Sequence, residues 1–251
     1  MSSDRNTVKN AVSSALEVMR YSGFEISDKL EVVLDPELPF MGYATKKGGK
    51  NAIVVSSMAM KSGPVEGLLI HEMCHIYRTE QNHPSHNSKL LNSVGHAVIN
   101  GNHLTEDYQI RTIQQAVNHI QDLYADDISF KVFEKSGTFT REQAFEFFLD
   151  WINDAAIQSK TKKDKWLTTG IILNNCFAIS NLKRHKINDI DNQAENKIQK
   201  FLSQVNPSTK EEFTYFRNFM TNLKENPIET QFKKDLTEYL TRTVKLAERS
   251  S

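Results

Sequence analysis

The sequence predicts an α+β protein in two parts, with a small, mostly antiparallel sheet among helices in residues 1–135 and helices alone in residues 136–251. All the β-like runs lie in the first part, between residues 30 and 56. The second part instead repeats apolar residues at helical spacing between helix-capping residues. Strands in one part of a chain and helices in the other are typical of an α+β fold.

The first part is expected to begin with a helix, followed by the three strands. Apolar side chains recur at helical spacing over residues 5–22, and Gly23 provides a stop signal. Turn-forming residues then separate the β-like runs, which are residues 30–34 (Leu-Glu-Val-Val-Leu), 42–45 (Gly-Tyr-Ala-Thr) and 51–56 (Asn-Ala-Ile-Val-Val-Ser). Such short connections favour antiparallel pairing.

Helices are predicted for most of the remaining first part. Residues 62–64 (Ser-Gly-Pro) form a helix entry, and this helix should run to about Arg78. Residues 79–103 are polar and predict a long loop that contains one short helix near residues 88–98. Acidic residues near the start of 105–135 then predict a long helix.

The second part consists of periodic segments that each predict a helix. Several are preceded by capping patterns, such as Thr140 followed three residues later by Gln143. The segments are residues 141–159, 163–182, 190–204, 209–224 and 228–247.

Charge and composition narrow the functional classes. The 251 residues include 31 basic and 31 acidic side chains, and this neutral balance argues against a protein that binds nucleic acid or anionic membrane as its main task. The longest apolar stretch, residues 167–179, is about 13 residues and falls short of the roughly 20 that a membrane span needs. Two cysteines cannot form a disulfide framework, and the first residues lack a signal-peptide pattern. We therefore expect a soluble, cytoplasmic protein.

Residues 71–75 read His-Glu-Met-Cys-His and carry the main chemical signal. His71 and His75 are four positions apart, so on a helix both imidazoles project from one face and can reach one metal ion. A zinc ion with three protein ligands keeps a fourth position for water and lowers the pKa of that water toward about 7. Glu72 lies about 100° around the helix and is expected to act as the general base that accepts a proton from this water.

The context of this motif favours a zinc site over an accidental pair of surface histidines. The motif lies on a predicted helix, follows the β-rich segment, and has apolar residues such as Leu69 and Ile76 on the other side of the helix. The metzincin extension would require Gly at position 78 and His at position 81, whereas the chain has Arg78 and Gln81. That class is therefore excluded.

The third ligand is expected on the next long helix. His119, Asp122 and Asp126 fall on one stripe of that helix, and any of them could face the metal. A carboxylate among apolar neighbours such as Leu123 and Ile128 is costly to bury unless it meets a cation. The spacing alone leaves all three candidates open.

Together the two motifs resemble the gluzincins, zinc metallopeptidases in which a second helix supplies an acidic third ligand. The resemblance is greatest to the soluble minigluzincins and the CAAX prenyl endopeptidase-like branch, whose second helix carries Glu-x-x-Ala-Asp. Residues 122–126 of this chain read Asp-Leu-Tyr-Ala-Asp, with Asp in place of the expected Glu. The resemblance extends over about residues 50–130 and implies a zincin-like core.

The resemblance implies one Zn²⁺ bound by His71, His75 and Asp122, with Glu72 as general base. Asp126 would accept the N–H of a ligand histidine and fix its tautomer. The implied activity is hydrolysis of a peptide or protein substrate. A second hypothesis is a zinc-stabilised, inactive or latent protein that binds a partner, because the usual Glu is missing and no oxyanion donor can be assigned.

Two further features bear on this site. If the resemblance holds, residues 51–56 are an edge strand to which an extended substrate could add; the alternative is a strand whose outer edge is covered. Four histidines, His83, His86, His96 and His103, follow the motif. Their irregular spacing favours an ordinary polar loop over a second metal site.

Overall fold

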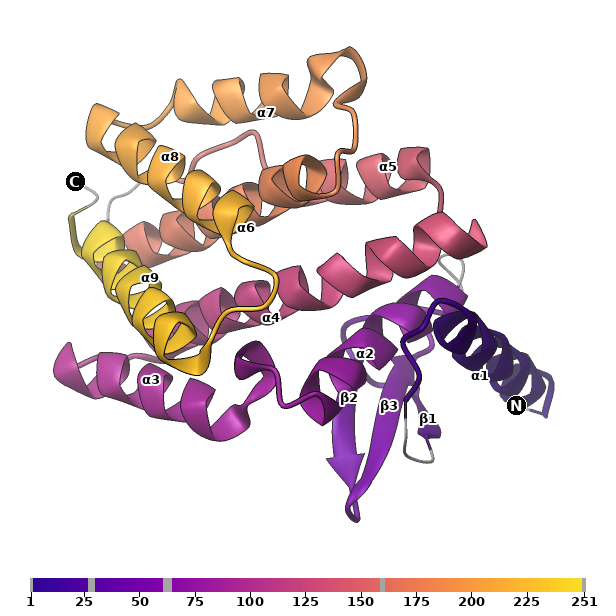
Figure 1. The fold of residues 1–251 in the computed structure, drawn as a ribbon. Coiled ribbons are helices and arrows are strands. Elements are labelled where there is room, and N and C mark those ends of the chain that lie inside the picture. The colour runs from indigo at the N-terminus through magenta and orange to yellow at the C-terminus, as the bar shows by residue number, and fades with distance from the viewer. Residues whose placement is uncertain (1, 27–29, 61–64, 159–160, 250–251) are drawn as a thin grey trace. The chain divides into compact units, whose positions relative to one another are not determined.

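The computed structural model describes residues 2–26, 30–60, 65–158 and 161–249. The chain divides into two compact units, one formed by residues 1–86 and 124–140 and the other by residues 87–123 and 141–251. Figure 1 shows the elements of each unit. The predicted helix entry at residues 62–64 lies outside the described residues.

The first unit contains a three-stranded mixed sheet in the order β1-β3-β2. The strands are β1 (Glu31–Asp35), β2 (Gly42–Lys47) and β3 (Lys50–Ser56). β2 and β3 pair antiparallel around the turn at residues 48 and 49, whereas β1 pairs parallel with β3. The expectation of a mostly antiparallel sheet is therefore only half right, because β3 lies between β1 and β2 and runs in the same direction as β1.

β3 is the central strand, so of the two alternatives for residues 51–56 the covered strand is confirmed and the edge strand is wrong. Both of its backbone edges are paired, from Ala52 to Ser56 with β1 and from Lys50 to Val55 with β2. Every residue from Asn51 to Ser56 is buried. A substrate therefore cannot add to β3 in the way proposed from the sequence.

Two helices pack on this sheet. The helix α1 (Ser2–Tyr21) contacts β1, and α2 (Val65–Glu80) contacts both β2 and β3 as well as α1. Their buried apolar side chains, including Met19 and Leu69, share one core with Ile53 and Val55 of β3. The predicted helix at residues 5–22 is confirmed, and the apolar spacing that predicted it is the face that it buries.

The helix α4 (Asp107–Ser136) is 30 residues long and runs through both units. Ile128 and Val132 from its second half join the core of the first unit. Its first half belongs to the second unit, together with α3 (Ser88–Gly101). The division therefore differs from the predicted boundary after residue 135, because the two halves of one helix bury their apolar faces against different partners.

Beyond residue 140, the described elements are helices, as predicted. Asn206 caps α8 by accepting a hydrogen bond from the Thr209 N–H, and Thr161 and Asp164 form a capping box on α6. Contacts join α6 to α5, α8 and α9, and α3 to α9. The elements are α5 (Arg141–Trp151), α6 (Lys162–Arg184), the 3₁₀ turn η2 (Ile190–Asn192), α7 (Gln193–Leu202), α8 (Pro207–Asn222) and α9 (Glu229–Arg249).

The polar stretch at residues 79–103 is more ordered than predicted. After α2 it forms a 3₁₀ turn, η1 (Pro84–His86), and then the whole of α3. Asn87 caps α3 by accepting a hydrogen bond from the Leu90 N–H. The buried Leu91, Val94 and Val98 recur at helical spacing and explain why this segment folds as a helix.

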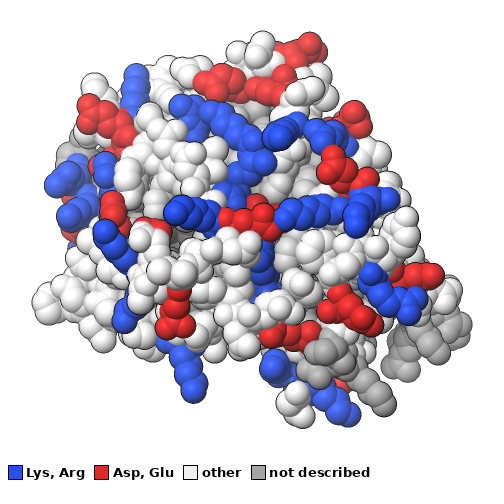
Figure 2. All heavy atoms as spheres, viewed as in Figure 1, with Lys and Arg blue, Asp and Glu red and all other residues white. Residues whose placement is uncertain are grey.

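In the described parts of the chain, no helix has the length and apolar character needed to cross a bilayer. On the face shown in Figure 2, basic side chains are interspersed with acidic ones. This mixture is consistent with the equal numbers of the two kinds in the sequence.

Candidate metal centre

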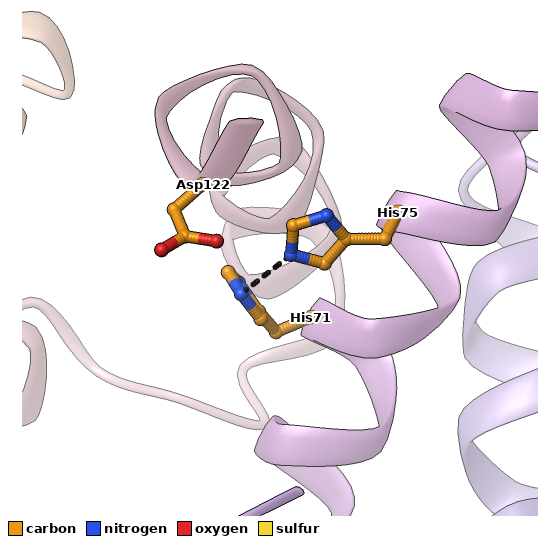
Figure 3. A group of neighbouring side chains, drawn as sticks. All are labelled: His71, His75 and Asp122. Atoms are coloured by element: carbon orange, nitrogen blue, oxygen red, sulfur yellow. Dashed lines mark hydrogen bonds between the residues drawn. The ribbon is translucent and has the colours of Figure 1, made fainter. Parts of the chain in front are cut away.

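The two histidines of the motif lie one turn apart on α2. Leu69, Met73 and Ile76 of the same helix are buried in the core, and this packing fixes how α2 is rotated. His71 and His75 are only partly buried, on another face of the helix. Their Nε2 atoms lie 3.1 Å apart, and Figure 3 shows the two rings converging beside Asp122. The helix thus presents two nitrogens to one point.

Asp126 lies behind His71. Its Oδ1 is 2.9 Å from Nδ1 of His71, and its side chain is largely buried. Because an ionised carboxylate only accepts hydrogen bonds, Nδ1 of His71 is the donor. In the neutral imidazole this leaves a lone pair on Nε2, the atom that faces His75.

His86 lies behind His75 in the same way. Its Nε2 is 2.8 Å from Nδ1 of His75, on the side of the His75 ring away from His71. Burial is the largest cause that lowers the pKa of His86 well below its ordinary value, and the nearby His75 is the next. An Nε2 atom that carries no hydrogen can accept the Nδ1–H of His75.

Asp122 completes a set of three possible ligands. One atom from each of His71, His75 and Asp122 lies within 4.8 Å of the other two (Figure 3). Asp122 lies one turn before Asp126 on the uninterrupted α4. The contact of Asp126 with His71 therefore also fixes the position of the Asp122 backbone relative to the two histidines.

This donor set fits a zinc ion. Zinc–nitrogen bonds of about 2.0–2.1 Å in a tetrahedral site place two ligand nitrogens roughly 3.3 Å apart. The 3.1 Å between the two Nε2 atoms is close to that value. Two imidazoles and one carboxylate also form the ligand type of known catalytic zinc sites.

The other two candidates for third ligand lie elsewhere. Asp126 contacts Nδ1 of His71, which is the opposite side of the ring from Nε2. The ring of His119 is stacked on Phe177, with centroids 5.0 Å apart, and is 2% exposed. Burial lowers the pKa of His119 to about 4. Of the three candidates, only Asp122 groups with both histidines of α2.

Glu72 and Cys74 share the same helical turn but have different surroundings. Glu72 directly follows His71, and only 6% of it is exposed. Cys74 is fully buried in the core, with its Sγ 3.9 Å from Sδ of Met19, and burial raises the pKa of its thiol to about 12. Cys74 is therefore a packing residue and not a ligand or nucleophile.

Sequence reasoning missed the three residues that follow α2. His83, Ser85 and His86 are all buried, and Ser85 Oγ lies 2.8 Å from Nδ1 of His86 and 2.7 Å from Nδ1 of His83. The irregular spacing of His83 and His86 predicted an ordinary polar loop. One feature of the sequence could have indicated their role. Both histidines follow the motif helix within a few residues, in a turn-forming segment that contains Asn82 and Pro84.

Residues 9–245 match the family of unknown function DUF5781. The chain belongs to this family. The matched residues lie in both units and include α2, α4 and all the residues of the candidate centre. Comparisons with curated proteins and with solved structures gave no match.

Proposed function

We propose that this DUF5781 protein is a zinc-dependent metallopeptidase of gluzincin type that acts on peptide or protein substrates in the cytoplasm. The observation that carries the proposal is the grouping of His71, His75 and Asp122 around one point. Glu72 lies within the same turn as the first of these ligands, as general base catalysis in this class of hydrolase requires. The Asp-for-Glu difference leaves the ligand type unchanged.

In this proposal, His71, His75 and Asp122 hold the ion. When bound, zinc would polarise the carbonyl of the scissile peptide bond and lower the pKa of a water molecule. Asp126 orients the ring of His71, and His86 orients the ring of His75. In these orientations both Nε2 atoms are directed toward the position of the ion.

Glu72 supplies the proton transfers. Its carboxylate accepts one proton from the water that adds to the peptide carbonyl carbon, and it then donates this proton to the amide nitrogen as the carbon–nitrogen bond breaks. The products are a carboxylic acid and an amine, so the atoms of one water are consumed for each bond cleaved. The low exposure of Glu72 keeps its carboxylate away from bulk water.

Replacing this base tests the proposal directly. Glu72→Gln should retain stoichiometric zinc but lose hydrolysis of unfolded casein by about 10²–10⁴-fold, the usual contribution of a general base. Glu17→Gln, the same charge change at an exposed position of α1, is the matched control and should cleave at the wild-type rate. Undiminished cleavage by Glu72→Gln would show that the base is wrongly assigned.

The burial of Glu72 also favours a second candidate function, a latent or inactive zinc protein that binds a partner. Such a protein would bind one zinc ion without turning over substrate. Zinc content and turnover of unfolded casein, measured on the same preparation, separate the two. Stoichiometric zinc without turnover in any tested condition favours the latent protein, and measurable turnover that requires zinc favours the peptidase.

A further inference from the structure

We propose that His86 is a positioning residue for the metal ligand His75, and that His86, Ser85 and His83 form a directional hydrogen-bond chain that ends at this ligand. The inference rests on the proposed zinc site but does not require that the protein hydrolyse peptides. It assigns a role to three buried residues outside both motifs.

The chain consists of three consecutive short contacts. Nδ1 of His75 lies 2.8 Å from Nε2 of His86, and Nδ1 of His86 lies 2.8 Å from Ser85 Oγ. Ser85 Oγ in turn lies 2.7 Å from Nδ1 of His83. All three distances lie within the normal range for hydrogen bonds between side chains.

A metal ion on Nε2 of His75 determines the direction of every bond in this chain. Nδ1 of His75 must then carry the hydrogen and donate to Nε2 of His86. With Nε2 of His86 accepting, the hydrogen on Nδ1 of His86 is donated to Ser85 Oγ, which lies 2.8 Å away. Ser85 has one hydroxyl hydrogen, which it donates to Nδ1 of His83. The backbone N–H of Ser85 also points to Nδ1 of His83, at 3.3 Å, which agrees with an acceptor at that atom.

The way in which α2 ends explains why the residues that follow it, including His86, lie beside the side chain of His75 on the same helix. Asn82 adopts a left-handed conformation, with φ of 51°. The N–H of His83 donates to the carbonyl of Arg78 at 2.9 Å, and the N–H of Asn82 donates to that of Thr79 at 3.1 Å. These two bonds define a Schellman motif, which reverses the chain at the end of a helix.

The far end of the hydrogen-bond chain is anchored to α4. The ring of His83 packs on that of Tyr124, with centroids 4.8 Å apart. The carbonyl of Tyr124 accepts a hydrogen bond from Nε of Arg78 on α2, at 2.9 Å. Tyr124 follows Asp122 by two residues, so the hydrogen-bond chain from His75 ends against the helix that carries Asp122.

Burial makes this arrangement specific. His83, Ser85 and His86 are each less than a tenth exposed, so solvent cannot readily replace a missing partner. A buried polar group that loses its hydrogen bond is costly, which favours the single ring orientation of His75 that satisfies every member of the chain. We therefore expect a higher zinc affinity than in a protein whose His75 ring is not held by this hydrogen-bond chain.

Zinc affinity, measured by competition with a chromophoric chelator, tests the inference without reference to activity. His86→Ala should bind zinc about 10–100-fold more weakly, the usual effect of removing a partner of a ligand histidine. His86→Gln should restore most of this affinity, because its Oε1 can accept from Nδ1 of His75. His96→Ala, which removes an exposed histidine on α3, should match the wild type. Equal affinities for His86→Ala and the wild type would overturn the inference.

The ring tautomers give a second, independent measurement on the unaltered protein. Long-range ¹H–¹⁵N correlation spectra of the zinc-loaded protein should show the hydrogen of His86 on Nδ1 and that of His83 on Nε2. The opposite assignment at His86 would overturn the inference even if His86→Ala fails to fold. Zinc binding with these tautomers but without casein cleavage would contradict only the proposed peptidase function. A protein that binds no zinc would contradict both the peptidase function and the proposed role of His86.

Discussion

Asp126 and His71 are joined across two helices, with Oδ1 of the aspartate 2.9 Å from Nδ1 of the histidine. Asp122 lies one helical turn earlier, so α4 brings two carboxylates toward α2 from the same stripe. One contacts the back of a ligand ring, and the other faces the point to which both Nε2 atoms turn. The two carboxylates therefore have different roles, which substitutions can separate.

Removing the charge of Asp126 should weaken zinc binding without abolishing it. Asp126→Asn keeps the size of the side chain but loses the charge that favours the Nδ1–H tautomer of His71, so we expect about 10–100-fold lower zinc affinity. Chelator competition measures this effect, and Glu134→Gln, at an exposed position of the same helix, serves as the control. An unchanged affinity in Asp126→Asn would mean that this contact does not orient the ligand.

Changes at Asp122 should have a larger effect on zinc affinity that depends on side-chain chemistry. Asp122→Asn replaces a carboxylate ligand with a neutral amide, and its loss of affinity should exceed that of Asp126→Asn. Asp122→Glu keeps the carboxylate and should stay within about tenfold of the wild type. If Asp122→Asn binds zinc as tightly as the wild type, the third ligand lies elsewhere.

His119 should make the metal-free protein less stable in mild acid. Burial lowers its pKa from 6.5 to about 4, so below pH 6.5 the unfolded chain binds a proton that the folded protein does not. The free energy of unfolding should therefore fall by about 3 kcal/mol between pH 6.5 and pH 4 through this residue. Urea unfolding across this range in the presence of a chelator measures the effect. His119→Phe should show a flatter pH dependence by that amount, and parallel curves would contradict the assignment.

Gly42 should be required for the close approach of β2 to its neighbours. A Cβ at this position would lie 2.7 Å from the Val54 carbonyl oxygen and 3.3 Å from Leu68 on α2. We expect Gly42→Ala to lower the free energy of unfolding by about 1–3 kcal/mol. Gly95→Ala is the matched control, because a Cβ there meets no atom within 4 Å outside the neighbouring backbone of its own helix and should stabilise α3 by roughly 0.5–1 kcal/mol. Thermal or urea unfolding of both variants compares the two, and equal effects would contradict the close contact.

Much of the fold was predictable because it depends on local pattern. Apolar periodicity predicted α1 and the helices after residue 140, and acidic residues near its start predicted α4. The burial of the apolar faces explains the success of the periodicity. Spacing along one helix predicted that His71 and His75 share a face, whereas on the next helix it left His119, Asp122 and Asp126 open. The resemblance to the gluzincins selected Asp122, which does group with the two histidines. The helices and the pair of histidines needed only the spacing within one helix.

The rest depends on contacts between distant segments. β1 pairs in parallel with the edge of β3 that β2 does not occupy, and no local pattern specifies this pairing. The continuous apolar run in β3 was nevertheless a signal of a strand buried on both faces. His86 could not be placed beside His75 without the left-handed turn at Asn82, and the apolar surroundings of His119 come from Phe177, 58 positions away.

The most direct test is anomalous X-ray diffraction at the zinc edge from crystals grown with zinc. We predict one zinc peak within about 2.0–2.2 Å of Nε2 of His71, Nε2 of His75 and one carboxylate oxygen of Asp122. Diffraction data that show no zinc at these three atoms, in crystals where the protein is folded and zinc is present, would contradict the central claim.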